Sequence, residues 1–161
     1  MFNLKAEFYF KIILVISFIA LISAYFIEYV LGHQPCNLCL IERIPYGLSI
    51  ILIFTILLFK RNEKFITLLL ILTFIFSFAI SLYHYGIEKG FFEESAICGL
   101  KNFNEFITKE DLLKQLNKKI ISCKDVTFKF FGLSLTAINI VISLVFIVTL
   151  FKIYVKYEKN K

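Results

Sequence analysis

Polar residues are scarce in this sequence, and the usual signs of a multidomain soluble protein are missing. Only 19% of the 161 residues are charged, whereas 59% are hydrophobic, and the mean hydropathy is +0.80. A soluble domain averages roughly 45–50% apolar residues, so this composition excludes a large soluble core and indicates a membrane protein. The chain contains no internal repeat, low-complexity tract or Gly/Ser-rich linker. We therefore expect one membrane domain that spans residues 1–161.

Acidic residues are also few, which leaves a net charge of +6. The basic residues flank the apolar segments and do not alternate with aromatic residues on one face. This distribution argues against nucleic-acid binding and favours contact with anionic lipid headgroups.

Four long apolar stretches occupy most of the chain, at residues 10–31, 40–59, 65–83 and 133–151. Each is close to the roughly 20 residues that a helix needs to cross the hydrocarbon core of a bilayer. The first stretch is longer than the core of a signal peptide, and no Ala-x-Ala cleavage pattern follows it, so we expect it to be retained. The predicted fold is an all-α membrane protein, a bundle of four transmembrane helices.

The connections between these stretches differ greatly in length. Residues 32–39 and 60–64 are short turns, whereas residues 84–132 form a long loop, and loops of this length usually carry function. Within the long loop, Thr108 and Asp111 resemble a helix capping box. Apolar residues then recur at helical spacing, at Leu112, Leu113, Leu116 and Ile120. We expect a short amphipathic helix there, lying on the bilayer surface.

The distribution of basic residues predicts the orientation in the membrane. Short segments near the spans hold most of the concentrated positive charge, and an even number of crossings puts all of them on one side: Lys5, Lys11, Lys60, Arg61, Lys64, Lys152, Lys156, Lys159 and Lys161. The positive-inside rule therefore places both termini in the cytoplasm and the loops 32–39 and 84–132 in the periplasm. All the cysteines of the chain then lie in the compartment where disulfides persist: Cys36, Cys39, Cys98 and Cys123.

Cysteine and histidine are too few and too dispersed for a typical zinc motif. A C-x-x-C pair supplies half of such a site, but Cys98 and Cys123 lie far apart, and the only histidines are His33 and His84. We therefore expect no metal. Two structural disulfides remain an alternative, although a C-x-x-C ring removes little chain entropy and more often serves thiol exchange.

Arg43 follows Cys39 by four residues, which is one helical turn if the second span begins there. Its guanidinium and the helix N-terminus would stabilise a Cys39 thiolate. The alternative role of Arg43 is to extend toward the lipid headgroups. Pro45 fits the first turn of a helix that begins shortly before it, but it would kink a helix that begins at Cys39.

Three segments resemble the DsbB-type disulfide-bond-formation proteins of bacterial inner membranes. They are "PCNLCLIERIPY" at the start of the second span, "YHYGIEKG" after the third, and "CKDVTFKFFGLSLTAIN" before the fourth. The resemblance covers nearly the whole chain. Relatives often carry a tryptophan after the last cysteine, which this chain lacks, and Phe128 or Phe130 is expected to substitute for it. Glu42 stands where glutamine is common.

The resemblance implies a relay of electrons between two cysteine pairs. Cys98 and Cys123 would form a disulfide, with Cys98 accepting attack from a reduced periplasmic thioredoxin-fold oxidase of the DsbA type. Cys36 and Cys39 would form a second disulfide that passes two electrons to a membrane quinone, either ubiquinone or menaquinone. Cys39 would lie next to the quinone, and Arg43 would hold the quinone as its charge develops.

Other residues are weaker candidates. His84 lies at the outer end of the third span, where it would bind or protonate the quinone or belong to an interfacial aromatic belt. His33 is expected to be a polar turn residue, and Glu28 to be solvated. Asn139 is expected to form hydrogen bonds between helices. Residues 91–94, "FFEE", are candidates for recognition of the partner protein.

Two rival functions follow from the same motifs. Vitamin K epoxide reductases also have four helices and a C-x-x-C pair, but their pair lies in a later helix, whereas here it opens the second. A structural or adaptor protein with two static disulfides would resist mild reductants, and its Arg43 would be replaceable.

Overall fold

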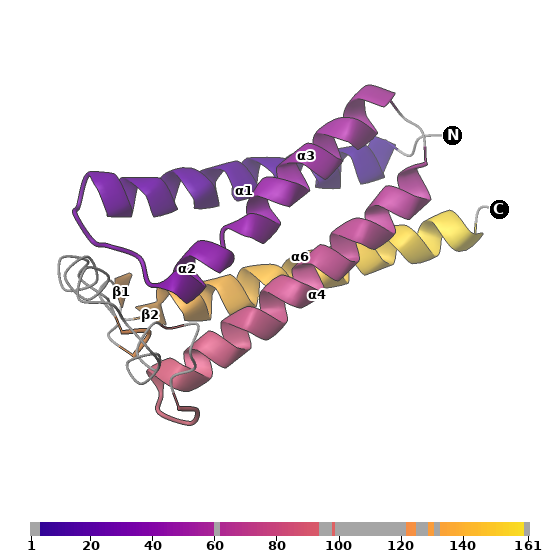
Figure 1. Ribbon diagram of the computed structural model, residues 1–161. Coiled ribbons are helices and arrows are strands. Elements are labelled where there is room, and N and C mark those ends of the chain that lie inside the picture. Colours follow the sequence, from indigo (N-terminus) through magenta and orange to yellow (C-terminus); the bar gives the residue numbers. More distant parts are fainter. Residues whose placement is uncertain are drawn as a thin grey trace, which may run out of the picture.

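The computed structural model describes residues 4–59, 62–93, 98, 122–124, 129–130 and 133–159. The amphipathic helix predicted within residues 108–120, Glu94, Phe128 and the side chain of Phe130 lie outside this part of the chain. The described elements, in chain order, are α1 (Leu4–Tyr29), α2 (Asn37–Ile41), α3 (Ile44–Phe59), α4 (Glu63–Glu88), β1 (Lys129–Phe130), β2 (Leu133–Ser134) and α6 (Leu135–Lys159) (Figure 1).

Four helical segments are long and apolar enough to cross a membrane, which confirms the predicted all-α bundle. They run from Ala6 to Tyr29, from Asn37 to Phe59, from Glu63 to Glu88 and from Leu135 to Tyr157. At 1.5 Å per residue, α1 and α4 are each about 39 Å long, which exceeds the ~30 Å hydrocarbon core. We therefore treat the chain as a multi-pass membrane protein.

Two predicted boundaries were wrong at the ends that lie near the cysteines. The third span continues to Glu88, so His84 belongs to α4 and not to the following loop. The fourth span begins at Leu135, because Leu133 and Ser134 pair with Phe130 and Lys129 in a two-residue antiparallel ladder. Gly90 ends α4 with a φ of +78°, a conformation that glycine adopts without steric cost.

The second span is interrupted at Glu42 and Arg43, between α2 and α3. Pro45 is the second residue of α3, where a missing backbone N–H leaves no helical hydrogen bond unmade. Helix α3 therefore begins just before the proline. This matches the interpretation in which Pro45 lies in the first turn of a helix. The break leaves α2 as a separate helical turn, in which Leu38 is buried and Leu40 is exposed.

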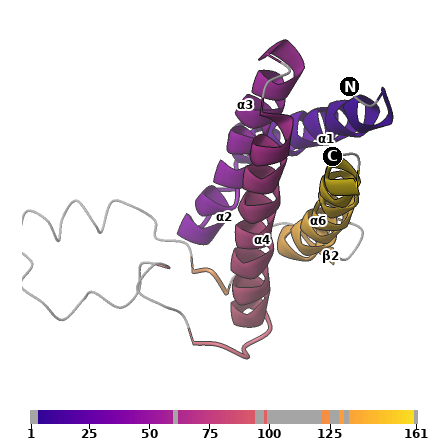
Figure 2. The ribbon, with the colours of Figure 1, turned by 90° about the vertical axis from the view of Figure 1, so that its right-hand side faces the viewer.

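The helices form two pairs, α4 with α6 and α1 with α3. In the side view, α4 runs next to α3 and α6 (Figure 2). Both termini and the turn between α3 and α4 lie at one end, whereas α2 and the β1–β2 ladder lie at the other (Figure 1). We call the second end the cysteine end.

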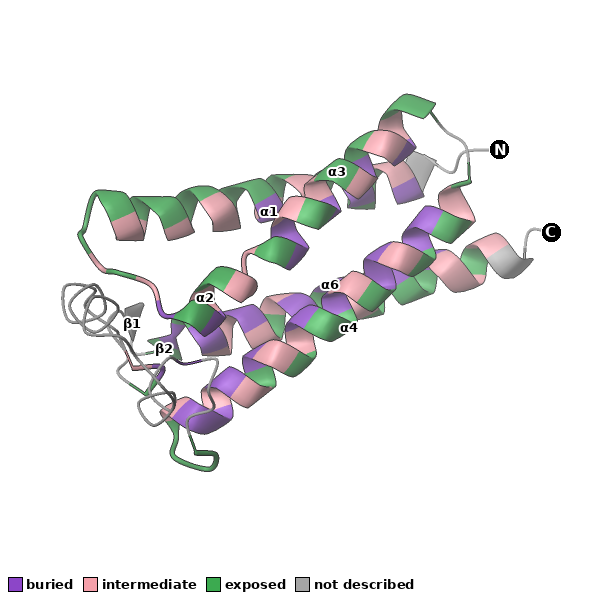
Figure 3. Cartoon of the chain, in the orientation of Figure 1, coloured by how far each residue is buried: buried purple, intermediate pink, exposed green. Residues whose placement is uncertain are grey.

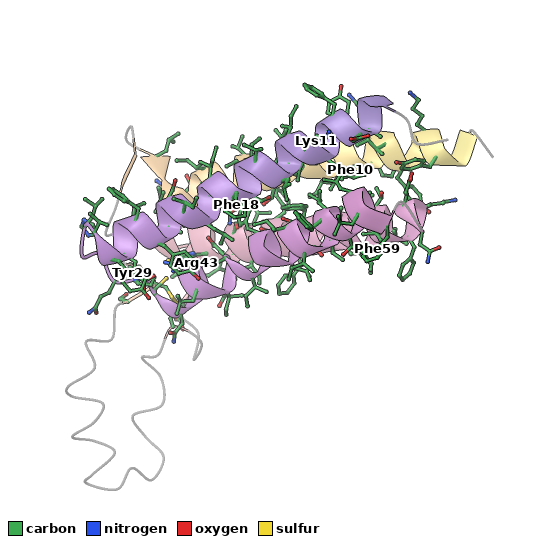
Figure 4. The ribbon with its side chains drawn as sticks, turned by 90° about the horizontal axis from the view of Figure 1, so that it is seen from above. Phe10, Lys11, Phe18, Tyr29, Arg43 and Phe59 are labelled. Carbon is green, nitrogen blue, oxygen red and sulfur yellow. A yellow bond between two sulfur atoms is a disulfide. The ribbon has the colours of Figure 1, made fainter. Side chains whose placement is uncertain are left out.

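Apolar side chains fill the middle of the bundle and also cover its outer surface. Phe74 and Phe146 pack edge to face with ring centroids 4.8 Å apart, and Phe10 is buried at the end that holds the termini. The outward faces of the helices are exposed (Figure 3), and they carry large apolar side chains such as Phe18 and Phe59 (Figure 4). Such an apolar exterior is suited to lipid and not to water.

Small polar residues join the helices inside the bundle. Ser17 of α1 and Ser49 of α3 are 3.1 Å apart, and Ser143 of α6 lies at the same distance from Ser77 of α4. Small side chains allow close helix approach, and hydrogen bonds between them hold neighbouring spans together where no hydrophobic driving force acts.

Candidate functional site

The four cysteines converge at one end of the bundle, although they lie far apart in the chain. Cys98 and Cys123 form a disulfide with a Cα–Cα distance of 5.7 Å, so the pairing implied by the family resemblance is confirmed. Cys36 and Cys39 are thiols whose sulfur atoms are 2.7 Å apart. All four belong to one apolar cluster, together with Leu38, Ile87 and their neighbours.

The local structure of α2 polarises the Cys36 thiol. Cys36 is the N-cap of α2, and its sulfur accepts a hydrogen bond of 3.3 Å from the backbone N–H of Cys39. The Cys39 thiol and, less strongly, the His84 ring lower the pKa of the Cys36 thiol to about 5, against the opposing effect of burial. The sequence predicts a stabilised thiolate at Cys39, whereas these contacts favour negative charge on Cys36.

A histidine and a carboxylate extend the site behind Cys36. His84 Nε2 lies 3.6 Å from the Cys36 sulfur, and its Nδ1 lies 2.9 Å from Glu42 Oε1. Because a carboxylate only accepts hydrogen bonds, Nδ1 carries the proton of that contact, and this fixes which ring nitrogen faces the sulfur. Polar contacts thus link Cys36 at the start of α2 to His84 of α4, and His84 to Glu42 at the α2–α3 break. Sequence reasoning found the first two residues but missed the role of Glu42.

Asn139 of α6 holds Glu42 in place. Its side-chain nitrogen donates to Glu42 Oε2 at 3.2 Å and to Ser81 Oγ of α4 at 2.7 Å, and its oxygen accepts a hydrogen bond from the Tyr46 hydroxyl. The expectation that Asn139 bonds between helices is therefore confirmed. Nearby, the hydroxyl of Thr136 donates to Glu88 Oε1 at 2.6 Å.

Arg43 points from the α2–α3 break toward α1 (Figure 4). Its guanidinium forms an ion pair with Glu28 at 2.5 Å and lies 5.0 Å from the centre of the Tyr25 ring. Only 20% of the Glu28 side chain is exposed, so the expectation of a solvated Glu28 was wrong. Nothing in the sequence indicated this pair, because the two residues are 15 positions apart and meet only when α1 packs beside the break.

A mostly apolar cavity of about 750 Å³ lies between α1, α3 and α6 and reaches the cysteine end. The aliphatic part of its wall comes from α1 and α6, and His33 and Pro35 line it from the turn after α1. Its polar wall is formed by Cys39, Glu42, Arg43, Tyr46, Thr136 and Asn139. Among the described lining residues neither His84 nor Cys36 occurs, and His84 contacts this space through Glu42, which lines it.

These features narrow the chemistry of the site. A disulfide and a dithiol in one buried cluster can exchange electrons through thiol–disulfide chemistry. Fold and site together therefore define a disulfide-forming protein of the membrane.

The chain belongs to the DsbB family. Residues 6–153 match the sequence profile of that family, described as "Disulfide bond formation protein DsbB". The chain is also similar to "Uncharacterized protein RP370" of Rickettsia prowazekii (strain Madrid E), with 30% identity over 152 residues that cover 93% of this chain and 88% of that protein. The family membership supports a general role as a disulfide oxidoreductase.

Proposed function

We propose that this protein oxidises a periplasmic thioredoxin-fold oxidase of the DsbA type and passes the electrons to a membrane quinone. The bacterial periplasm is kept oxidising by relays of this kind. The observation that carries the proposal is the position of Cys39, which belongs to the cysteine cluster and also lines the apolar cavity. Cys39 therefore connects a thiol partner outside the bundle with an apolar substrate inside it.

The relay consists of three steps, and each step moves two electrons and two protons. The dithiol of the partner reduces the Cys98–Cys123 disulfide and becomes a disulfide itself. The resulting Cys98 and Cys123 thiols then reduce a Cys36–Cys39 disulfide by exchange. The Cys36–Cys39 dithiol finally gives two electrons and two protons to the quinone, which leaves as quinol. An oxidised outer pair beside a reduced inner pair is the state that precedes the last step.

The cavity supports a quinone as the final substrate. A volume of about 750 Å³ lies within the range of small-molecule sites, and its apolar wall is suited to a lipid-soluble ring. Cys39 would face the ring, and Arg43 would stabilise negative charge on the ring oxygen. Glu28 and Tyr25 hold the guanidinium at the cavity wall. His84 would act as a positioning residue, through Cys36 and Glu42.

We further propose that the cysteine end faces the periplasm, with the chain in the inner membrane. The start of α1, the turn-side ends of α3 and α4 and the end of α6 lie together at the opposite end (Figure 1), and the concentrated basic residues are in or next to these helix ends in the sequence. The positive-inside rule then places that end in the cytoplasm.

The proposal is tested by quinone reduction in detergent. The purified protein is mixed with a reduced thioredoxin-fold dithiol protein and with either ubiquinone or menaquinone, and loss of the oxidised quinone absorbance is followed. Catalytic reduction by the natural chain, its loss in Cys39→Ala and a raised KM for quinone in Arg43→Met are the expected results. If neither quinone is reduced while the partner dithiol is also left unoxidised, the relay is refuted.

A further inference from the structure

The three atoms that meet at the cysteine end form a candidate metal site. The sulfur atoms of Cys36 and Cys39 and a ring nitrogen of His84 all lie within 4.8 Å of one another. We propose that the Cys36–Cys39 dithiol, together with His84, binds one Zn²⁺ ion. This site goes beyond the electron relay, and it revises our expectation that the chain has no metal. That expectation rested on spacing along the sequence, in which His84 lies 48 positions from Cys36.

The distances fit tetrahedral zinc after a small change. With Zn–S of ~2.3 Å and Zn–N of ~2.0 Å, a sulfur and a nitrogen ligand are roughly 3.6 Å apart, and two sulfur ligands roughly 3.8 Å. The observed separation between Cys36 Sγ and His84 Nε2 is already 3.6 Å. The two sulfurs, at 2.7 Å, must move apart by about 1 Å, which rotation of the partly exposed Cys39 side chain can supply.

The surroundings of His84 are those of a zinc-binding histidine. Metal-bound imidazoles almost always donate their other N–H to a carboxylate or carbonyl oxygen, which fixes the tautomer and the ring orientation. Here Glu42 Oε1 takes that position, 2.9 Å from Nδ1, and Asn139 holds the second carboxylate oxygen. The nitrogen left to face the sulfurs is the one that a metal ion requires.

Charge and access also favour the ion. Two thiolates and a neutral imidazole balance the charge of Zn²⁺, so the ion and its three ligands together carry no net charge into a buried region. Three protein ligands leave a fourth position, which is typical of zinc sites that stay accessible. Cys39 lines the cavity, so water or a small ligand can occupy that position.

The ion would block the chemistry of the inner cysteine pair. A thiolate bound to zinc is not free to attack a disulfide, and both sulfurs must leave the metal before they can bond to each other. Zinc would therefore trap the site in its dithiol form. Oxidation of the pair to a disulfide would remove two ligands and release the ion.

The test uses the full-length chain with Cys98→Ser and Cys123→Ser, in which Cys36 and Cys39 are the only cysteines. After reduction and removal of the reductant, Zn²⁺ binding is measured by competition with a chelating dye. Co²⁺ serves as a spectroscopic probe, because thiolate coordination gives it intense absorption. Mg²⁺, a hard cation that prefers oxygen ligands, is the negative control. No quinone or partner protein is present, so the result is independent of the electron relay.

The proposal expects one ion per chain, with no binding after the inner pair is oxidised. His84→Ala should weaken binding at least ~100-fold, while Glu42→Gln, which leaves the ligands intact, should weaken it ~10–100-fold. His33→Ala is the matched control and should have no effect, and His84→Cys should restore binding because it supplies another zinc ligand. Circular dichroism shows which variants keep their helices. A second readout is the protection that bound Zn²⁺ gives Cys39 against an alkylating reagent.

Two results would overturn the site. One is absence of binding by the reduced chain at micromolar Zn²⁺. The other is Zn²⁺ binding whose affinity is the same in His84→Ala and Glu42→Gln as in the natural chain. The cysteine pair would then bind zinc without His84.

Discussion

Asn139→Ala tests whether the hydrogen bonds around Glu42 act as one unit that holds three spans together. The amide side chain bonds to Glu42, Ser81 and Tyr46, and these partners lie at the α2–α3 break, in α4 and in α3. Interhelical hydrogen bonds in membrane proteins contribute ~0.6 kcal/mol on average and up to ~1.7 kcal/mol. Because one partner is a carboxylate, we expect the loss of all three to cost about 2–3 kcal/mol of unfolding free energy.

Truncation at this position should add little cavity cost. Asn139 lines the existing cavity, so Asn139→Ala enlarges that space and does not create a new enclosed void. Ser143→Ala, one helical turn later in α6, is the matched control because it removes the bond to Ser77 and a weaker contact with Tyr46 but leaves the Asn139 amide in place. It should cost about 0.6 kcal/mol.

The assay is equilibrium unfolding of both variants in mixed micelles, with a denaturing detergent as titrant and helical circular dichroism as the signal. A second readout is the rate of quinone reduction, which Asn139→Ala should lower through Glu42 and which Ser143→Ala should leave unchanged. If the unfolding free energies of the two variants differ by less than about 0.5 kcal/mol, the reasoning fails, because the three bonds would then contribute no more than one.

Further predictions concern the charges and the loop at the cysteine end. The Cys36 thiolate should persist in mild acid, because the pKa of this thiol is lowered to about 5. Thiolate absorbance of the reduced chain should therefore fall to half near that pH. A midpoint near the ~8.5 of free cysteine would contradict the contacts of α2. Glu28→Gln and Arg43→Gln should each destabilise the chain, and a double-mutant cycle should give a coupling of about 1–3 kcal/mol, whereas additive effects would mean that the ion pair contributes nothing. Gly86→Ala should displace Phe92, because an added Cβ would lie 2.3 Å from that ring. Gly86→Ala and Phe92→Ala should then each raise the KM for the thiol partner, with no further rise in the double variant. An additive rise would show that Phe92 does not act from its position over Gly86.

Zinc binding and the electron relay use the same residues, but different variants test them. The relay fails if Cys39 is dispensable for quinone reduction, whereas the zinc site fails if His84 is dispensable for binding. His84→Cys separates the two most clearly, because it keeps a zinc ligand while removing the imidazole from the line between Cys36 and Glu42.

The amino-acid sequence by itself determined the four spans and pointed to the cysteines that meet at one end of the bundle. A helix that crosses lipid must satisfy its backbone internally and present about 20 apolar residues, so composition and length were enough to find each span. Asn139 could be assigned to an interhelical role because a buried amide within a span has few other partners. The two cysteine pairs were visible as motifs, and the Cys98–Cys123 disulfide followed from the resemblance.

Only the tertiary structure decided which polar groups meet. Glu28 with Arg43, and His84 with both Cys36 and Glu42, are contacts between different helices. They depend on how each helix is rotated about its own axis and on the break before Pro45, which turns Glu42 and Arg43 in different directions. Hydrophobic length specifies that a helix crosses the membrane but leaves its rotation open. Packing against neighbouring helices sets that rotation, and with it the chemistry of the site.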